Sequence, residues 1–151
     1  MPQSLAQIYL HLVFSTKNRE PFLKDPDLRA QMYAYLGGVC RNLECPALIV
    51  GGAQDHAHLL CRYSKNITVA NLLRDLKRSS SLWVKEQSSK SRVFYWQGGY
   101  GVFSISPSHI PSLTAYIRDQ ETHHLKMSFQ EEFRKLCRKY GVEIDERYVW
   151  D

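Results

Sequence analysis

The residues best suited to carry out chemistry are a histidine pair near the middle of the chain and a tyrosine–glutamine pair closer to its C-terminus. His56 and His58 flank a single alanine and precede an apolar run, so a β-strand would project both imidazoles from one face. Imidazole rings that are buried on an apolar strand face need a hydrogen-bonding group or a metal ion as a partner. Tyr116 and Gln120 have the spacing that places a phenol and an amide one helical turn apart. Together these residues predict a metal site beside a nucleophile, a combination suited to phosphodiester cleavage.

The ligand set favours a catalytic metal over a structural one. Two imidazoles and the amide oxygen of Gln120 are too few for a closed zinc site, but they leave positions open for phosphate oxygens and water, as catalytic Mg²⁺ or Mn²⁺ requires. Structural alternatives stay open on spacing alone. One histidine could be buried and hydrogen-bonded with the other exposed, and Tyr116 could be one of many packing tyrosines in a chain with nine.

The pattern of hydrophobic residues predicts the elements that position these side chains. Alternating residues indicate strands and helical periodicity indicates helices, in the order strand, helix, strand, strand, helix, strand. The expected ranges are 7–16, 25–43, 47–51, 56–63, 69–86 and 100–106. This order predicts an α+β, ferredoxin-like (split βαβ) antiparallel sheet with two helices on one face. A tyrosine-bearing helix over about 109–125 and a last helix opened by Ser128 and ended by Gly141 would follow, all in one domain spanning 1–151.

Composition is compatible with a soluble protein that contacts nucleic acid. The chain has 151 residues, 44% hydrophobic and 23% charged, with a net charge of +5. No segment is apolar enough to span a bilayer, and no signal peptide is evident, so we expect a cytoplasmic protein without a membrane partner.

A basic face on the second predicted helix could contact phosphates. Candidate DNA-contacting residues are Arg74, Lys77, Arg78 and Lys85, together with Arg118 beside the tyrosine. The same residues could form an ordinary solvated face. The aromatic stretch at 94–101 could stack on unpaired bases, although a packed loop is the simpler interpretation.

These motifs together resemble the single-tyrosine HUH transposases of bacterial insertion sequences (insertion sequence 200/605 group, TnpA-like). The name HUH denotes histidine, hydrophobic residue, histidine, which His56-Ala57-His58 matches, and the catalytic helix motif is matched by Tyr116 and Gln120. The resemblance extends over nearly the whole chain and includes the flanking segments 71–77, 96–104 and 120–124.

The resemblance implies a reaction and a set of partners. Tyr116 would attack a scissile phosphate and form a 5′-phosphotyrosine intermediate, with His56, His58 and Gln120 holding Mg²⁺ or Mn²⁺ and no nucleotide cofactor. The partner would be a single-stranded DNA hairpin at the ends of the element. The protein would act as a homodimer with composite active sites, the tyrosine helix of one subunit meeting the histidines of the other.

Two other functions remain compatible with the sequence. The chain could be a non-catalytic or domesticated protein that binds hairpins or other nucleic acid through a sheet like that of RNA-recognition domains. A plasmid replication initiator or relaxase with an HUH site is a weaker alternative, because those chains are usually larger and carry additional domains.

Overall fold

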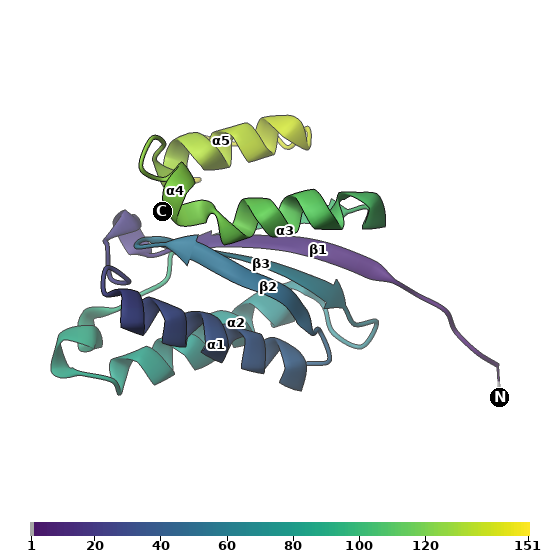
Figure 1. Ribbon diagram of the computed structural model, residues 1–151, viewed down its shortest axis with the longest axis horizontal. Helices are drawn as coiled ribbons and strands as arrows, with labels where there is room; N and C mark the ends of the chain where they lie inside the picture. Colours follow the sequence, from purple (N-terminus) through teal and green to yellow (C-terminus); the bar gives the residue numbers. More distant parts are fainter. Residues whose placement is uncertain (1) are drawn as a thin grey trace.

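A four-stranded antiparallel sheet forms the centre of the computed structural model, which describes residues 2–151 (Figure 1). The strand order is β2-β3-β1-β4, and the strands are β1 (Ile8–Ser15), β2 (Ala47–Ala53), β3 (His56–Tyr63) and β4 (Gly101–Ile105). The chain therefore has the ferredoxin-like, α+β arrangement predicted from the order of its elements.

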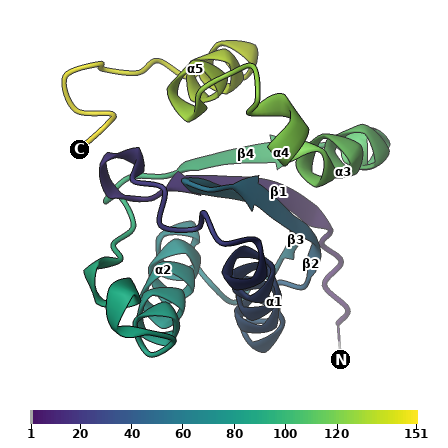
Figure 2. The same cartoon turned by 60° about the vertical axis from the view of Figure 1, so that its left-hand side comes forward.

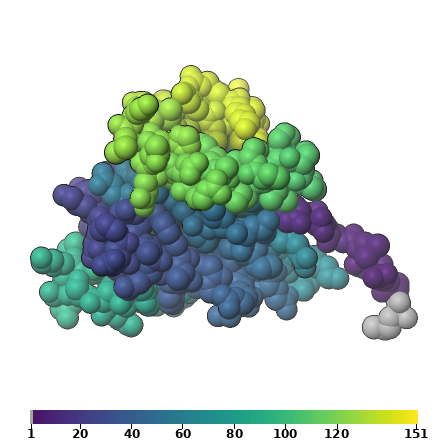
Figure 3. Space-filling view, viewed as in Figure 1, coloured from purple at the N-terminus to yellow at the C-terminus, as the bar shows by residue number. Residues whose placement is uncertain are grey.

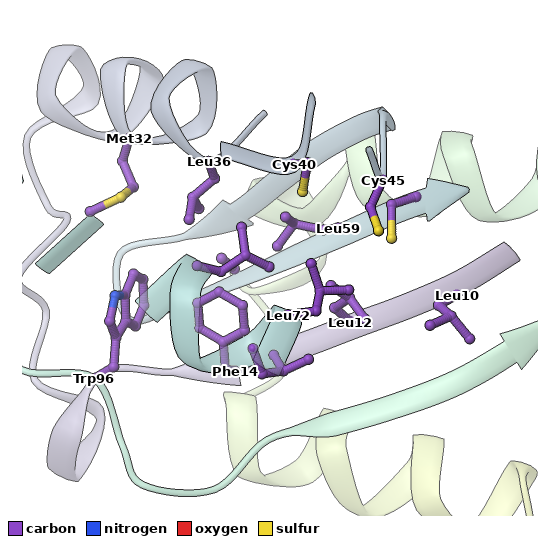
Figure 4. Close-up of a cluster of buried hydrophobic side chains, with 14 of the residues drawn as sticks. Leu10, Leu12, Phe14, Met32, Leu36, Cys40, Cys45, Leu59, Leu72 and Trp96 are labelled. Atoms are coloured by element: carbon purple, nitrogen blue, oxygen red, sulfur yellow. The ribbon is translucent and has the colours of Figure 1, made fainter. Parts of the chain in front are cut away.

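Helices α1 (Pro26–Asn42) and α2 (Val69–Lys85) cover one face of the sheet. Asp25 and Thr68 cap them, accepting hydrogen bonds from backbone N–H groups at 2.9 and 3.1 Å. The main core lies between these helices and the sheet (Figure 4), where Leu12 and Leu59 meet Leu36 and Leu72, all fully buried. This layer contains most of the buried hydrophobic residues of the described chain.

Three further helices cover the opposite face: α3 (Ile110–Arg118), α4 (Gln120–His123) and α5 (Phe129–Lys139) (Figure 2). They form a continuous layer over the sheet in the space-filling view (Figure 3). Ser128 caps α5, and Gly141, with φ of 68°, follows its C-terminus, as predicted. Both faces of the central strands are therefore buried, and the even-numbered histidines of β3 face the layer formed by α3 to α5.

Some predicted boundaries were wrong. The tyrosine-bearing helix expected over 109–125 is preceded by a short 3-10 helix (Pro107–His109) and divides into α3 and α4 at Asp119, whose ψ is 16°. The expected strand 47–51 continues to Ala53, because Gly52 and Ala53 also pair with β3. The connection between α2 and β4 contains a 3-10 helix (Ser89–Val93), and another such helix (Lys17–Arg19) follows β1.

Gly51 sets how closely α3 packs on β2. A Cβ atom at this position would lie 2.5 Å from the Ile117 carbonyl oxygen and 2.9 Å from Ile117 Cγ2. Ile117 is fully buried and follows Tyr116 directly in the chain. The absence of a side chain at Gly51 therefore lets the tyrosine helix approach the sheet.

We expect Gly51→Ala to destabilise the protein by about 1–3 kcal/mol, because the added methyl group would clash with Ile117 and force α3 away from the sheet. Chemical denaturation would measure the change. Gly38→Ala is the control, since a Cβ there meets no atom within 4 Å, and alanine in α1 should be neutral or stabilising by about 0.5–1 kcal/mol. Equal stabilities of Gly51→Ala and the wild type would show that α3 does not need this close approach.

Within residues 2–151, the structure contains no helix with the length and apolar character that crossing a membrane requires.

Candidate active site

The two histidines of β3 are the base of a buried polar cluster on the sheet face under α3 to α5. His56 and His58 are fully buried, and the alternation of β3 directs both rings to this face. Their ring centroids are 5.1 Å apart. The structure therefore brings both predicted imidazoles to one site.

The Nδ1 atom of each histidine has a polar partner. His56 Nδ1 lies 2.7 Å from Asp55 Oδ1, and His58 Nδ1 lies 2.8 Å from His11 Nε2. Asp55 is in the β2–β3 turn, and His11 comes from the neighbouring strand β1. Partners of this kind orient imidazoles whose other nitrogen binds a metal, so both Nε2 atoms are held toward the centre of the cluster.

The tyrosine–glutamine pair reaches the same cluster within one chain. Gln120 is fully buried, and its Oε1 lies 2.9 Å from His56 Nε2. The Tyr116 ring centroid is 6.0 Å from that of His58. The helix divides between the two residues, but both side chains point to the histidines. All four residues predicted from the motifs therefore converge.

Glu132 on α5 lies at the centre of the cluster, and the sequence reasoning missed it. Its Oε1 is 2.9 Å from His58 Nε2, while its Oε2 accepts hydrogen bonds from Gln120 Nε2, at 2.8 Å, and from the Tyr116 hydroxyl. The missed signal is an acidic residue among the buried apolar residues of an amphipathic helix, in line with Phe129 and Leu136. A buried carboxylate there requires polar partners.

Two further histidines adjoin the cluster. His124 Nε2 lies 3.1 Å from Glu132 Oε1, within ion-pair distance but without hydrogen-bond geometry, and its ring centroid is 4.3 Å from that of His56. The His123 ring lies 4.9 Å from the Tyr116 ring and packs against the phenol.

The protonation states of Glu132 and Tyr116 follow from their surroundings. Burial opposes ionisation of Glu132, but His58, which is hydrogen-bonded to it, and the adjacent His124 hold the pKa of its carboxyl below the usual range. Burial and the adjacent Glu132 carboxylate raise the pKa of the Tyr116 phenol. At neutral pH the phenol therefore keeps its proton and donates a hydrogen bond to the Glu132 carboxylate.

The donor set fits a divalent cation. His56, His58 and Glu132 are all buried, and each offers one ligand atom, with these atoms lying within 4.8 Å of one another. Neighbouring ligands of an octahedral ion at 2.0–2.1 Å are about 3 Å apart. His56 Nε2 and Gln120 Oε1 are 2.9 Å apart, and His56 Nε2 and Glu132 Oε1 are 3.6 Å apart. These separations are close to those of ligands around one ion.

A cleft of about 660 Å³ opens beside the phenol, between α3 and α5. Tyr116, Glu132 and His11 line its inner end. Three exposed lysines line it further out: Lys126, Lys135 and Lys139. The nucleophile candidate is therefore accessible through a cleft whose rim is positively charged.

The basic residues predicted on α2 lie on the other side of the sheet from Tyr116 (Figure 2). Arg74, Lys77 and Arg78 line a separate cleft with the exposed rings of Tyr95 and Tyr100.

Four of the five predicted DNA-contacting residues have partners within the chain, and the first of them, Arg74, donates from Nε to Asp75 Oδ1 at 3.1 Å. Lys77 Nζ donates to the carbonyl oxygens of Gln97 and Gly99, at 2.7 and 2.6 Å, and burial lowers its pKa to about 8. Lys85 Nζ lies 4.1 Å from the centroid of the Tyr95 ring. Arg118 is exposed on α3 beside Asp119, 3.6 Å away. Lys77 is therefore used to hold the loop at 97–99.

A ferredoxin-like sheet that carries a buried His-x-His pair, a tyrosine, and carboxylate and amide oxygens could hold a metal ion beside a phenol. Residues 4–120 match the family described as "Transposase IS200 like". The chain belongs to this family, which confirms the resemblance drawn from its motifs.

Solved structures share the fold. A candidate transposase from Deinococcus radiodurans R1 is 17% identical, with a TM-score of 0.60, and the match covers 80% of this chain and 96% of that one. A REP-associated tyrosine transposase bound to a REP hairpin is 13% identical, with a TM-score of 0.59, covering 82% of this chain and 73% of that one. No curated protein gives a significant sequence match.

Proposed function

We propose that the protein is a DNA transposase that cleaves and rejoins single-stranded DNA through Tyr116. The observation that carries the proposal is the convergence of Tyr116, Gln120, His56 and His58 in one buried cluster beside a cleft. Membership of the family supports the same assignment. We also propose a cytoplasmic location, which the resemblance to transposases of bacterial insertion sequences supports.

The proposed chemistry is a transesterification. The Tyr116 oxygen attacks the scissile phosphorus, its bond to phosphorus forms, and the bond from phosphorus to the 3′ oxygen breaks. The phenol loses a proton and the departing 3′ oxygen gains one, so protons balance and the released strand ends in a 3′-hydroxyl. Because one phosphodiester replaces another, the 3′-hydroxyl of a second strand could reverse the step without a nucleotide cofactor.

Mg²⁺ or Mn²⁺ held by His56, His58 and Gln120 would polarise the phosphate and stabilise charge on the leaving oxygen. Asp55 and His11 orient the two imidazoles for this role. The raised pKa of Tyr116 keeps the free phenol protonated, so the nucleophile would form only when substrate and metal are in place.

The lysines of the α3–α5 cleft would hold the strand that enters the site. We expect the double variant Lys135→Ala with Lys139→Ala to weaken single-stranded DNA binding and to reduce the magnitude of its logarithmic salt slope by about 1.4. Fluorescence anisotropy at several salt concentrations would measure this. Arg138→Ala, exposed on the same helix but outside the cleft lining, is the control. An unchanged salt slope would exclude the cleft as the strand path.

The remaining basic residues would contact a different part of the DNA. Arg74, Arg78 and Lys85 lie across the sheet from Tyr116, so we propose that they contact the hairpin and not the scissile phosphate. Lys77 would act by holding the loop, and Arg118 by contacting DNA near the tyrosine. A homodimer with composite sites stays a prediction of the resemblance, since the residues of the cluster also meet within one chain.

The alternative of a binding protein with a stacking sheet has less support. β1 and β3 lie between two helical layers and are mostly buried, whereas stacking of bases on a sheet requires an open face.

The deciding experiment uses a library of single-stranded DNA hairpins with randomised flanks, incubated with the protein and Mn²⁺ and then denatured. A 5′-phosphotyrosine intermediate would carry 3′-labelled DNA with the protein, while 5′-labelled DNA would be released. No covalent adduct with any label would favour the binding-protein alternative.

A further inference from the structure

We propose that Glu132 is a ligand of the catalytic metal, and that the same carboxylate holds the nucleophile. The inference rests on the metal site of the proposed function and adds to it a residue of α5. Residues 4–120 are those that match the family, so Glu132 lies outside the matched segment.

The first argument is the position of the two carboxylate oxygens. Oε1 faces the imidazoles, 2.9 Å from His58 Nε2 and 3.6 Å from His56 Nε2. Oε2 faces the opposite way and accepts from Gln120 and Tyr116. One oxygen is therefore directed at the metal ligands and the other at the nucleophile.

The second argument is the orientation of the groups around His56. Gln120 Nε2 donates to Glu132, so the amide must direct its oxygen at His56 Nε2, 2.9 Å away. Asp55 already accepts from the other nitrogen of the same ring. Gln120 Oε1, Glu132 Oε1 and His56 Nε2 therefore converge on one point. Because all three atoms can act as acceptors, this arrangement requires a proton or a metal cation between them.

The third argument is charge. Two neutral imidazoles and an amide would leave the charge of a divalent cation uncompensated in a buried site. Mg²⁺ and Mn²⁺ prefer carboxylate oxygen, and Glu132 is the carboxylate that lies within ligand distance of both histidines. Phe129, Phe133 and Leu136 flank Glu132 on α5 and are buried, so their packing fixes the position of this helix.

Mn²⁺ binding without DNA tests the inference, measured by isothermal titration calorimetry and by the electron paramagnetic resonance signal of free Mn²⁺. We expect Glu132→Gln, which keeps the shape and can still hydrogen-bond, to weaken binding at least about tenfold. Glu131→Gln is the matched control, because Glu131 is exposed one residue away on the same helix. Glu132→Asp keeps the negative charge on a side chain that is shorter by one methylene group, so it should bind Mn²⁺ with intermediate affinity. This variant replaces Glu132→Gln in the experiment if Glu132→Gln does not fold.

Wild-type affinity in Glu132→Gln, with weakened binding in His56→Asn, would overturn the inference, as would a wild-type protein that binds no Mn²⁺. The proposed function fails separately. Loss of Mn²⁺ binding in Glu132→Gln, with no covalent DNA adduct from the wild type, would leave Glu132 as a metal ligand in a protein that is not a strand transferase.

Discussion

Tyr116→Phe should abolish the covalent DNA adduct while leaving hairpin binding nearly unchanged. The substitution removes only the hydroxyl, and the ring keeps its packing against His123 and His58, whose centroids lie 4.9 and 6.0 Å away. Without the oxygen no phosphotyrosine bond can form. Denaturing gel electrophoresis of 3′-labelled DNA would measure the adduct, and anisotropy would measure binding.

Tyr140→Phe is the matched control for this prediction. Tyr140 lines the same cleft and stacks on Phe103, with ring centroids 4.6 Å apart. Its hydroxyl is not a partner of the polar cluster around Glu132, so adduct formation should persist. Adduct formation by Tyr116→Phe at the wild-type level would remove Tyr116 as the nucleophile and make Tyr140 the next residue to test.

His56→Asn should reduce Mn²⁺-dependent cleavage at least about a thousandfold, because loss of a bound metal removes several kcal/mol of charge stabilisation from the transition state. The substitution shortens the side chain so that it no longer spans between Asp55 and Gln120, its two partners in the cluster. Cleavage of labelled hairpin DNA across a range of Mn²⁺ concentrations would measure the effect, and circular dichroism would verify the fold.

His109→Asn provides the comparison for the metal prediction. His109 is exposed, lines the cleft, and is not among the hydrogen-bond partners of His56 and His58, so its replacement should leave the response to Mn²⁺ unchanged. Cleavage by His56→Asn at the wild-type rate, or a wild-type enzyme indifferent to metal, would contradict a metal role for the histidine pair.

The helix α5 changes how the C-terminal part of the chain should be regarded. It follows the segment that matches the family, and its amphipathic pattern is typical of a packing element. Yet Glu132 on this helix contacts Tyr116, Gln120 and His58. The helix therefore supplies the polar centre of the candidate site as well as covering the sheet.

The sequence by itself determined the order of the elements and the two motifs of the site. Alternation in a strand has a period of two residues, so His56 and His58 had to share a face wherever the strand was placed. The spacing of Tyr116 and Gln120 likewise placed them on one side of a helical segment, even though the helix divides at Asp119. These are local properties, set by backbone geometry within a few residues.

Only the tertiary structure decided which other groups join these motifs. His11 reaches His58 through the pairing of β1 with β3, and Glu132 reaches it through the packing of α5 on the sheet. Packing also separated the basic residues of α2 from the tyrosine by placing them in the opposite layer. Such contacts join residues far apart in the chain, and they depend on which apolar faces meet, which no local periodicity contains.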